Sequence, residues 1–75
     1  MNNFSNLNYL KSELKKITHH FELKDFDYVI QKSIILIKKN PQQIPFYNFL
    51  GLAYRQKGKL YLAEKILYEA HKMEP

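Results

Sequence analysis

Residues 44–75 read IPFYNFLGLAYRQKGKLYLAEKILYEAHKMEP, and this stretch decides the fold. Tyr47, Leu50 and Tyr54 recur at i, i+3 and i+7, so they share one face of a helix. Gly51 lies on the adjoining face, where the absence of a side chain lets another helix approach closely. Gly58 comes at the end of this helix, where a left-handed residue is needed and glycine adopts that conformation without steric cost.

A second apolar face follows at helical spacing, formed by Leu60, Ala63, Ile66, Leu67, Ala70 and Met73. Two helices joined by so short a turn are antiparallel neighbours. The stretch therefore predicts a helical hairpin with a close contact between its helices at Gly51.

Eight positions of this hairpin agree in order and spacing with the signature of one tetratricopeptide repeat, a helix–turn–helix unit of about 34 residues. The signature positions are Tyr47, Leu50, Gly51, Tyr54, Ala63, Leu67, Ala70 and Pro75. Tyr47 stands where the family pattern has Trp, and Leu67 where it has Phe. The resemblance implies a scaffold that binds other proteins; the alternative is a helical hairpin of another kind with a small-residue contact.

An earlier, degenerate repeat over residues 8–41 is indicated by Pro41, which precedes Pro75 by the length of one such repeat. Here Ile17, Thr18 and Phe21 can take the Leu-Gly-x2-Tyr places only if the turn lost one residue. Lys24-Asp25 would then replace the usual turn. The first hairpin thus resembles the family in its layout and closing proline, and not in its key side chains. Such departures are typical of terminal, capping repeats.

The first helix is predicted over about residues 6–23, with Ser5 or Asn6 as its N-cap. Its apolar residues form a one-sided stripe: Leu7, Leu10, Leu14, Ile17 and Phe21. Asp25 is a good N-cap for the second helix. That helix should bury Phe26, Val29, Ile30, Ser33, Ile34 and Ile37, with Ile35 and Leu36 widening the face so that it is covered on two sides. Asn40-Pro41 ends it, and Pro45 suits the first turn of the third helix.

The predicted fold is therefore all-α, with four helices in two antiparallel helix–turn–helix repeats; the resemblance adds a right-handed superhelical arrangement. We expect one domain over residues 1–75, made of a loose tail (1–5), the degenerate repeat (6–41) and the well-matched repeat (42–75). It can be the N-terminal part of a longer protein.

The composition excludes several classes of function. The chain has no cysteine, so it has neither disulfides nor zinc thiolates, which suits the cytoplasm. No apolar run is long enough to span a membrane. His19 and His20 point about 100° apart on a helix, so they cannot share a metal ion. Without a phosphate-binding loop or a nucleophile motif, we expect no cofactor, no metal and no catalysis.

The resemblance implies a ligand groove lined by the first helix of each repeat. In the second repeat the groove positions are Asn48, Phe49, Leu52, Arg55 and Gln56; in the first they are Lys15, Lys16, His19 and Glu22. Phe49 and Leu52 would supply apolar contacts, or else pack against the neighbouring helix. Arg55 would bind a carboxylate. Some family members grip a C-terminal carboxylate pair with a Lys and two Asn residues. Here Leu52 replaces one such Asn and Phe49 the other, which argues against that mode.

The expected function is binding of a protein or peptide that carries acidic groups. One alternative is a repeat segment of a larger enzyme, such as a bacterial transferase, that recruits its substrate. A weaker alternative is RNA binding by the basic surface (net charge +5), which we do not favour because no run of like charges exists.

The last helix would expose Leu62, Ile66 and Met73 together with Tyr61 and Tyr68. We therefore expect the isolated chain to self-associate.

Overall fold

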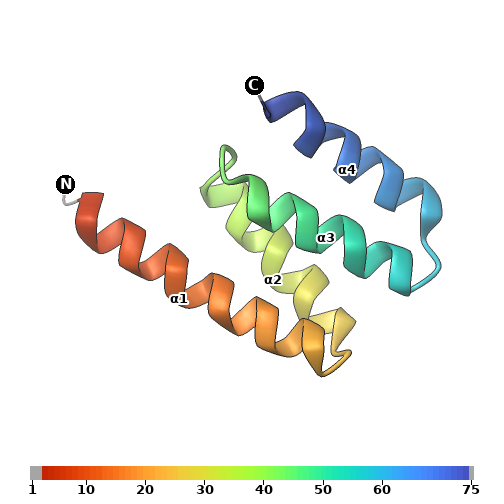
Figure 1. Ribbon diagram of the computed structural model, residues 1–75, viewed down its shortest axis with the longest axis horizontal. Helices are drawn as coiled ribbons and strands as arrows, with labels where there is room; N and C mark the ends of the chain where they lie inside the picture. Colours follow the sequence, from red (N-terminus) through yellow and green to blue (C-terminus); the bar gives the residue numbers. More distant parts are fainter. Residues whose placement is uncertain (1–2, 75) are drawn as a thin grey trace.

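The computed structural model describes residues 3–74, and these form four helices without a strand. The helices are α1 (Asn3–Glu22), α2 (Phe26–Lys39), α3 (Ile44–Gln56) and α4 (Leu60–Met73). The all-α fold of two helical hairpins predicted from the sequence is confirmed. In Figure 1, α1 and α3 run in the same direction, and α4 lies on the side of α3 away from α1. The central element is α3, which packs against the other three helices, whereas among the described helices α4 packs against α3 alone.

The two hairpins repeat each other with a constant offset along the chain. The number of residues between the first residues of α2 and α4 equals the number between their last residues. The last residues of α1 and α3 are separated by the same number. Lys24 and Gly58 are both left-handed, at φ 64° and 79°. The residues that follow them, Asp25 and Lys59, have φ/ψ of −87°/70° and −90°/69°. The two turns also share their hydrogen bonds, because the amide of Asp25 donates to the carbonyl of His20 and that of Lys59 to the carbonyl of Tyr54.

This offset corrects the predicted alignment of the first repeat. The turn has not lost a residue, because three residues separate the helices in both hairpins. Lys24 takes the place of the turn glycine and adopts its left-handed conformation. Ile17 therefore stands at the place of Gly51, and Ser33 at the place of Leu67. Both Ile17 and Ser33 are fully buried. The first hairpin thus pairs a large residue on its first helix with a small one on its second, the reverse of the second hairpin.

Gly51 brings α3 and α4 into close contact. A Cβ atom at this position would lie 2.5 Å from Cγ and Cδ2 of Leu67, so a larger residue fits only if the Leu67 side chain moves. Ala63 and Ala70 are buried on the same side of α4, at 1% and 2% exposure. Small residues on both helices therefore allow the two backbones to approach closely.

Of the apolar residues that we expected to be exposed on α4, some are exposed and others are half-buried. Tyr61, Leu62 and Tyr68 are exposed, as predicted. Ile66 and Met73 are half-buried instead, because they lie nearer to the face of α4 that packs against α3.

The main core lies between α1, α2 and α3. It consists of Leu10, Ile17, Val29, Leu36, Phe46 and Ala53. Two predicted core positions on α1 and α2 are largely exposed instead, and on α4 Leu60, predicted on the apolar face, is 60% exposed. Leu7 is 52% exposed because α1 begins at Asn3, three residues before its predicted start, and its N-terminal end projects beyond the helices it packs on (Figure 1). Ser5 and Asn6 therefore lie inside the helix, as do residues 3–5 of the predicted tail, while residues 1–2 lie outside the described residues. Ile35 is 50% exposed, because α2 is covered on the side of Leu36 but not on the side of Ile35.

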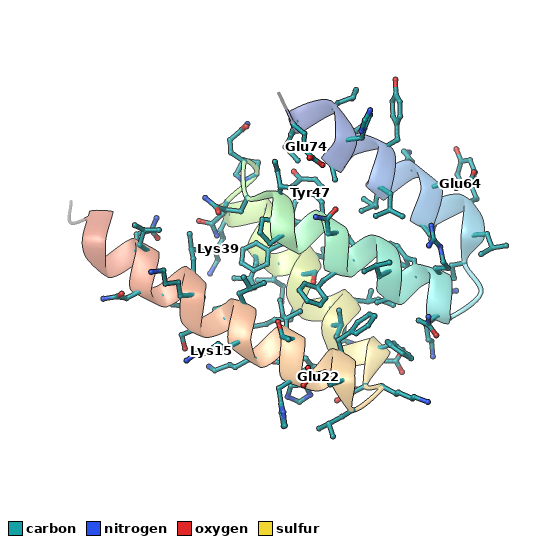
Figure 2. The ribbon with its side chains drawn as sticks, in the orientation of Figure 1. Lys15, Glu22, Lys39, Tyr47, Glu64 and Glu74 are labelled. Atoms are coloured by element: carbon teal, nitrogen blue, oxygen red, sulfur yellow. The ribbon has the colours of Figure 1, made fainter. Side chains whose placement is uncertain are left out.

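The turns are held by side chains near the helix starts. The Asp25 carboxylate accepts a hydrogen bond from the Tyr28 amide at 3.4 Å, which confirms it as the N-cap of α2. His20 Nδ1 lies 3.0 Å from the other oxygen of Asp25, and the His20 ring stacks on Tyr28 at 3.7 Å. Tyr47, labelled in Figure 2, donates from its hydroxyl to the Pro41 carbonyl at 2.8 Å. This bond ties the start of α3 to the preceding turn.

Candidate functional site

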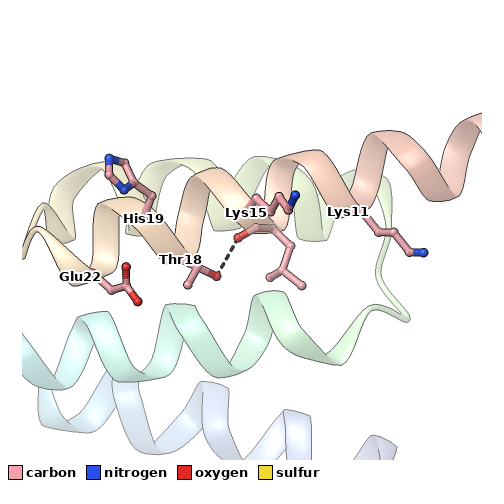
Figure 3. A pocket seen from close by; sticks show the side chains of 6 residues that line it. Lys11, Lys15, Thr18, His19 and Glu22 are labelled. Atoms are coloured by element: carbon pink, nitrogen blue, oxygen red, sulfur yellow. Dashed lines mark hydrogen bonds between the residues drawn. The ribbon is translucent and has the colours of Figure 1, made fainter.

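A hollow of about 410 Å³ lies along one side of α1. Its lining residues share a face because they recur at helical spacing: Lys11, Leu14, Lys15, Thr18, His19 and Glu22. Figure 3 shows Thr18 and Glu22 pointing from α1 toward α3, while His19 lies at the edge of this face that is farther from α3. The Thr18 hydroxyl donates to the Leu14 carbonyl at 2.8 Å, so it offers a ligand only its acceptor lone pairs.

A second hollow of about 90 Å³ continues the first toward the N-terminal ends of α1 and α3. It is lined by Leu7, Leu10, Lys11, Leu14, Gln43, Pro45 and Phe46. Lys11 and Leu14 line both hollows, so the two adjoin along the side of α1 that faces α3. We call the two hollows together the α1 groove. Its apolar lining is Leu7, Leu10, Leu14, Pro45 and Phe46, with lysines at the rim.

Charge at the rim of the α1 groove is mainly positive. Lys11 and Lys15 are exposed, and among the described residues neither forms an ion pair. Glu22, at the far end, is also without an ion pair within that part of the chain. An anionic ligand group would therefore meet two available ammonium groups before any carboxylate.

The predicted site residues on α3 lie beside the α1 groove without lining either hollow. Asn48, Leu52 and Arg55 recur at i, i+4 and i+7, and all three are exposed, Leu52 at 37%. Gln56 is exposed at the end of the helix. These four side chains form an open strip on α3 that can extend a binding surface from the α1 groove.

Phe49 packs against its neighbours, which was the alternative to a ligand contact. Its ring meets Phe21 edge to face at 5.5 Å, and Phe21 meets Phe26 in the same way at 5.2 Å. Phe49 is partly buried against the main core. An aromatic chain from α3 through α1 to α2 therefore holds the three helices together, and Phe49 has only part of its surface left for a partner.

Lys16 lies away from the α1 groove, in a charge cluster between α1 and α2. The Glu13 carboxylate, 4% exposed, pairs with Lys32 Nζ at 3.0 Å and with Lys16 Nζ at 3.3 Å. Burial alone would raise the pKa of Glu13, but the hydrogen bonds and charges of Lys32 and Lys16 outweigh it and lower the pKa below 4.5. The hydrogen bond to Glu13 raises the pKa of Lys32 above 10.5 against the opposing effect of burial. Lys16 therefore serves this cluster and not the predicted groove.

Of the first-repeat predictions, Lys15, His19 and Glu22 lie together in the hollow. Sequence reasoning missed Lys11, Leu14 and Thr18. Lys11, Lys15, Thr18 and Glu22 recur at i, i+4, i+7 and i+11, and this polar stripe was a signal that could have found them. Leu14 was assigned to the core stripe alone, whereas it both touches the core and lines the groove.

Comparisons with protein-family models, with curated proteins and with solved structures find no match to this chain. Within residues 3–74, no three His, Cys, Asp or Glu side chains gather closely enough to hold a metal ion. No helix in the same range combines the length and apolar character that crossing a bilayer requires.

Proposed function

We propose that this chain is a tetratricopeptide-like interaction module that binds a segment of a partner protein in the α1 groove. The observation that carries the proposal is the pair of adjoining hollows along α1, which share Lys11 and Leu14. A groove with an apolar lining and a few polar groups at its rim is a usual form of a peptide-binding surface. Cytoplasmic location, expected from the sequence, stays a prediction.

The repetition of the hairpins supports the assignment to a helical-repeat family. The structural period, read from the equivalent ends of the helices, agrees with the tetratricopeptide unit of about 34 residues. Gly51 and Leu67, two positions of the sequence signature, form a very close contact between α3 and α4. We propose that the two hairpins stack in the right-handed sense of that family, with α1 and α3 lining the ligand side.

The chemistry of the groove indicates the class of partner. Leu7 is half-exposed beside Leu10 and Leu14, so a bulky apolar side chain can cover these leucines. Lys11 and Lys15 flank that position one helical turn apart, and Arg55 lies exposed on α3. The partner segment is therefore an apolar residue flanked by Asp or Glu.

Selection from a random peptide library tests the proposal. We expect the full chain to select peptides with a Leu, Ile or Phe between acidic residues. Lys15→Glu should lower the affinity for the tightest selected peptide by about tenfold, because it replaces an attractive exposed contact with a repulsive one. Lys39→Glu, on the exposed C-terminal turn of α2, changes the net charge equally and is the matched control.

Two results would contradict the proposal. One is selection without acidic or apolar enrichment. The other is equal weakening by Lys15→Glu and Lys39→Glu, because that would reflect net charge alone. A single-stranded RNA oligonucleotide provides a separate control: steep loss of its binding between about 50 and 200 mM salt, with no peptide selected, would favour nucleic acid as the ligand.

A further inference from the structure

The outer side of α4 carries a stripe of four residues that the α1 groove does not use. Tyr61, Glu64, Lys65 and Tyr68 recur at i, i+3, i+4 and i+7 and line a shallow hollow of about 310 Å³. Tyr61 is 75% exposed and Tyr68 60% exposed. Figure 2 shows Glu64 on the side of α4 away from α3. We call these four residues the α4 stripe.

The stripe lies opposite the contact with α3. Ala63 and Ala70 are the buried residues of α4, and they are turned toward α3, the one helix that α4 contacts within residues 3–74. The α4 stripe is about half a helical turn away from them. It is therefore not occupied by any described part of the same chain, although it presents two large aromatic rings to solvent.

Charge favours a second copy of this chain as the occupant. The chain carries a net charge of +5, but α4 holds two acids, Glu64 and Glu69, and two bases, Lys65 and Lys72, so this helix is neutral with histidine uncharged. Lys72 pairs with Glu69 at 3.4 Å and lies 5.3 Å from the centre of the Tyr68 ring. Glu64 and Lys65 form no ion pair with another described residue. Two basic chains therefore repel each other least when they approach through α4.

The order of the four residues is complementary to itself. When two α4 helices lie antiparallel about a two-fold axis between residues 64 and 65, Tyr61 of each copy faces Tyr68 of the other. In the same arrangement Glu64 of each copy faces Lys65 of the other, so the dimer has two Glu64–Lys65 contacts. We propose that the chain forms a homodimer through the α4 stripe in this antiparallel register.

The expected dimer is weak and depends on concentration. Each Tyr can bury roughly 150–250 Å² of surface, so the four rings contribute on the order of 600–1,000 Å². That is below the roughly 1,200–2,000 Å² of a stable interface. The dimer should therefore form at high concentration and dissociate on dilution. The proposed dimer contact and the α1 groove involve different helices, because α1 and α4 do not touch.

Sedimentation equilibrium of the full chain and four variants tests this inference. Glu64→Lys alone or Lys65→Glu alone gives two like-charge contacts per dimer, and each should weaken the dimer by about tenfold. The double variant Glu64→Lys/Lys65→Glu exchanges the charges and should restore the dissociation constant to within about threefold of wild type. Lys39→Glu, outside the stripe, changes the net charge by the same amount as Lys65→Glu and is the control for that variant.

The rescue by the double variant is the decisive result, because a non-specific aromatic contact would not show it. All of these residues are exposed, so the variants are expected to fold, and far-UV circular dichroism checks this. A wild-type chain that stays monomeric at millimolar concentration overturns the proposal and leaves the stripe to a different partner. A dimer whose double variant is weaker than both single variants overturns the antiparallel register.

Discussion

Ser33 places a hydroxyl in the core where the second hairpin has Leu67. It is fully buried, and its Oγ has no hydrogen-bond partner among the described residues. The side chain fits because the residue is small, while the polar atom carries an uncompensated desolvation cost. The expected result of Ser33→Ala is therefore a more stable protein, by about 1 kcal/mol.

Urea unfolding of Ser33→Ala beside Ser12→Ala measures this gain. Ser12 is exposed, so its replacement controls for the change in helix propensity. A loss of stability specific to Ser33→Ala would mean that the hydroxyl is hydrogen-bonded in solution and contributes to the core.

The shifted pKa values of Glu13 and Lys32 predict how the stability of the fold depends on pH. The pKa of Glu13 is lower in the folded chain than its ordinary value of 4.5, so its contribution is present above pH 4.5 and is lost as the pH falls through the folded pKa. The pKa of Lys32 is raised above 10.5, so its contribution is present below pH 10.5 and is lost as the pH rises through the folded pKa. The ion pair therefore stabilises the fold between these limits.

Urea unfolding from pH 3 to pH 8 tests the acidic limit. Wild type should lose stability below about pH 4.5 more steeply than Glu13→Gln, which cannot titrate at this position. Glu74→Gln, exposed just after α4 and outside the α4 stripe, is the matched control for the loss of one carboxylate. Identical profiles for wild type and Glu13→Gln would show that the buried pair does not stabilise the folded state.

At the scale of the helices, the contact between Gly51 and Leu67 predicts a rescue experiment. Gly51→Ile places a branched side chain where even a Cβ atom is 2.5 Å from Leu67, and we expect a loss of about 3 kcal/mol from overpacking. Gly51→Ile/Leu67→Ser copies the first hairpin, where Ile17 and Ser33 hold the equivalent positions. The double variant should be more stable than Gly51→Ile alone.

Thermal and urea unfolding of the two single variants and the double variant measure the coupling between these positions. Leu67→Ser alone removes buried apolar surface and should also destabilise the protein. If the double variant loses the sum of the two single losses, the positions are independent, and the correspondence between the hairpins has no energetic meaning.

The helices could be predicted because their signals are local. Asp25 as an N-cap, Asn40-Pro41 as a stop and the apolar spacing of residues 60–73 each act within one or two turns, and the structure agrees with them. The alignment of the first hairpin could not be predicted in this way. It depends on the left-handed conformation of Lys24, which residues other than glycine rarely adopt.

The candidate site was predicted in part, for a related reason. Lys15, His19 and Glu22 follow from the face of one helix, and they do lie together. Lys16 was misplaced because its partners Glu13 and Lys32 meet only when α1 and α2 pack, and that pairing has no signature in the spacing of either helix. Leu14 was missed because one side chain serves both the core and the groove.

At the scale of the whole molecule, α3 separates two surfaces of different chemistry. The α1 groove has leucine walls with Lys11 and Lys15 at its rim, whereas the α4 stripe is aromatic and electrically balanced. Because α1 and α4 share no contact, each surface can be altered without the other. The proposed peptide site and the proposed dimer contact therefore predict variants that impair one without impairing the other.

Backbone amide NMR shifts show whether a peptide binds this chain in the α1 groove. The measurement titrates ¹⁵N-labelled full chain with the tightest peptide from the library selection. We predict that the largest shifts fall between Lys11 and Glu22 on α1, with a second group between Asn48 and Arg55 on α3. Largest shifts on the α4 stripe or on α2, with the amides of Lys11, Leu14 and Lys15 unmoved, would contradict the account.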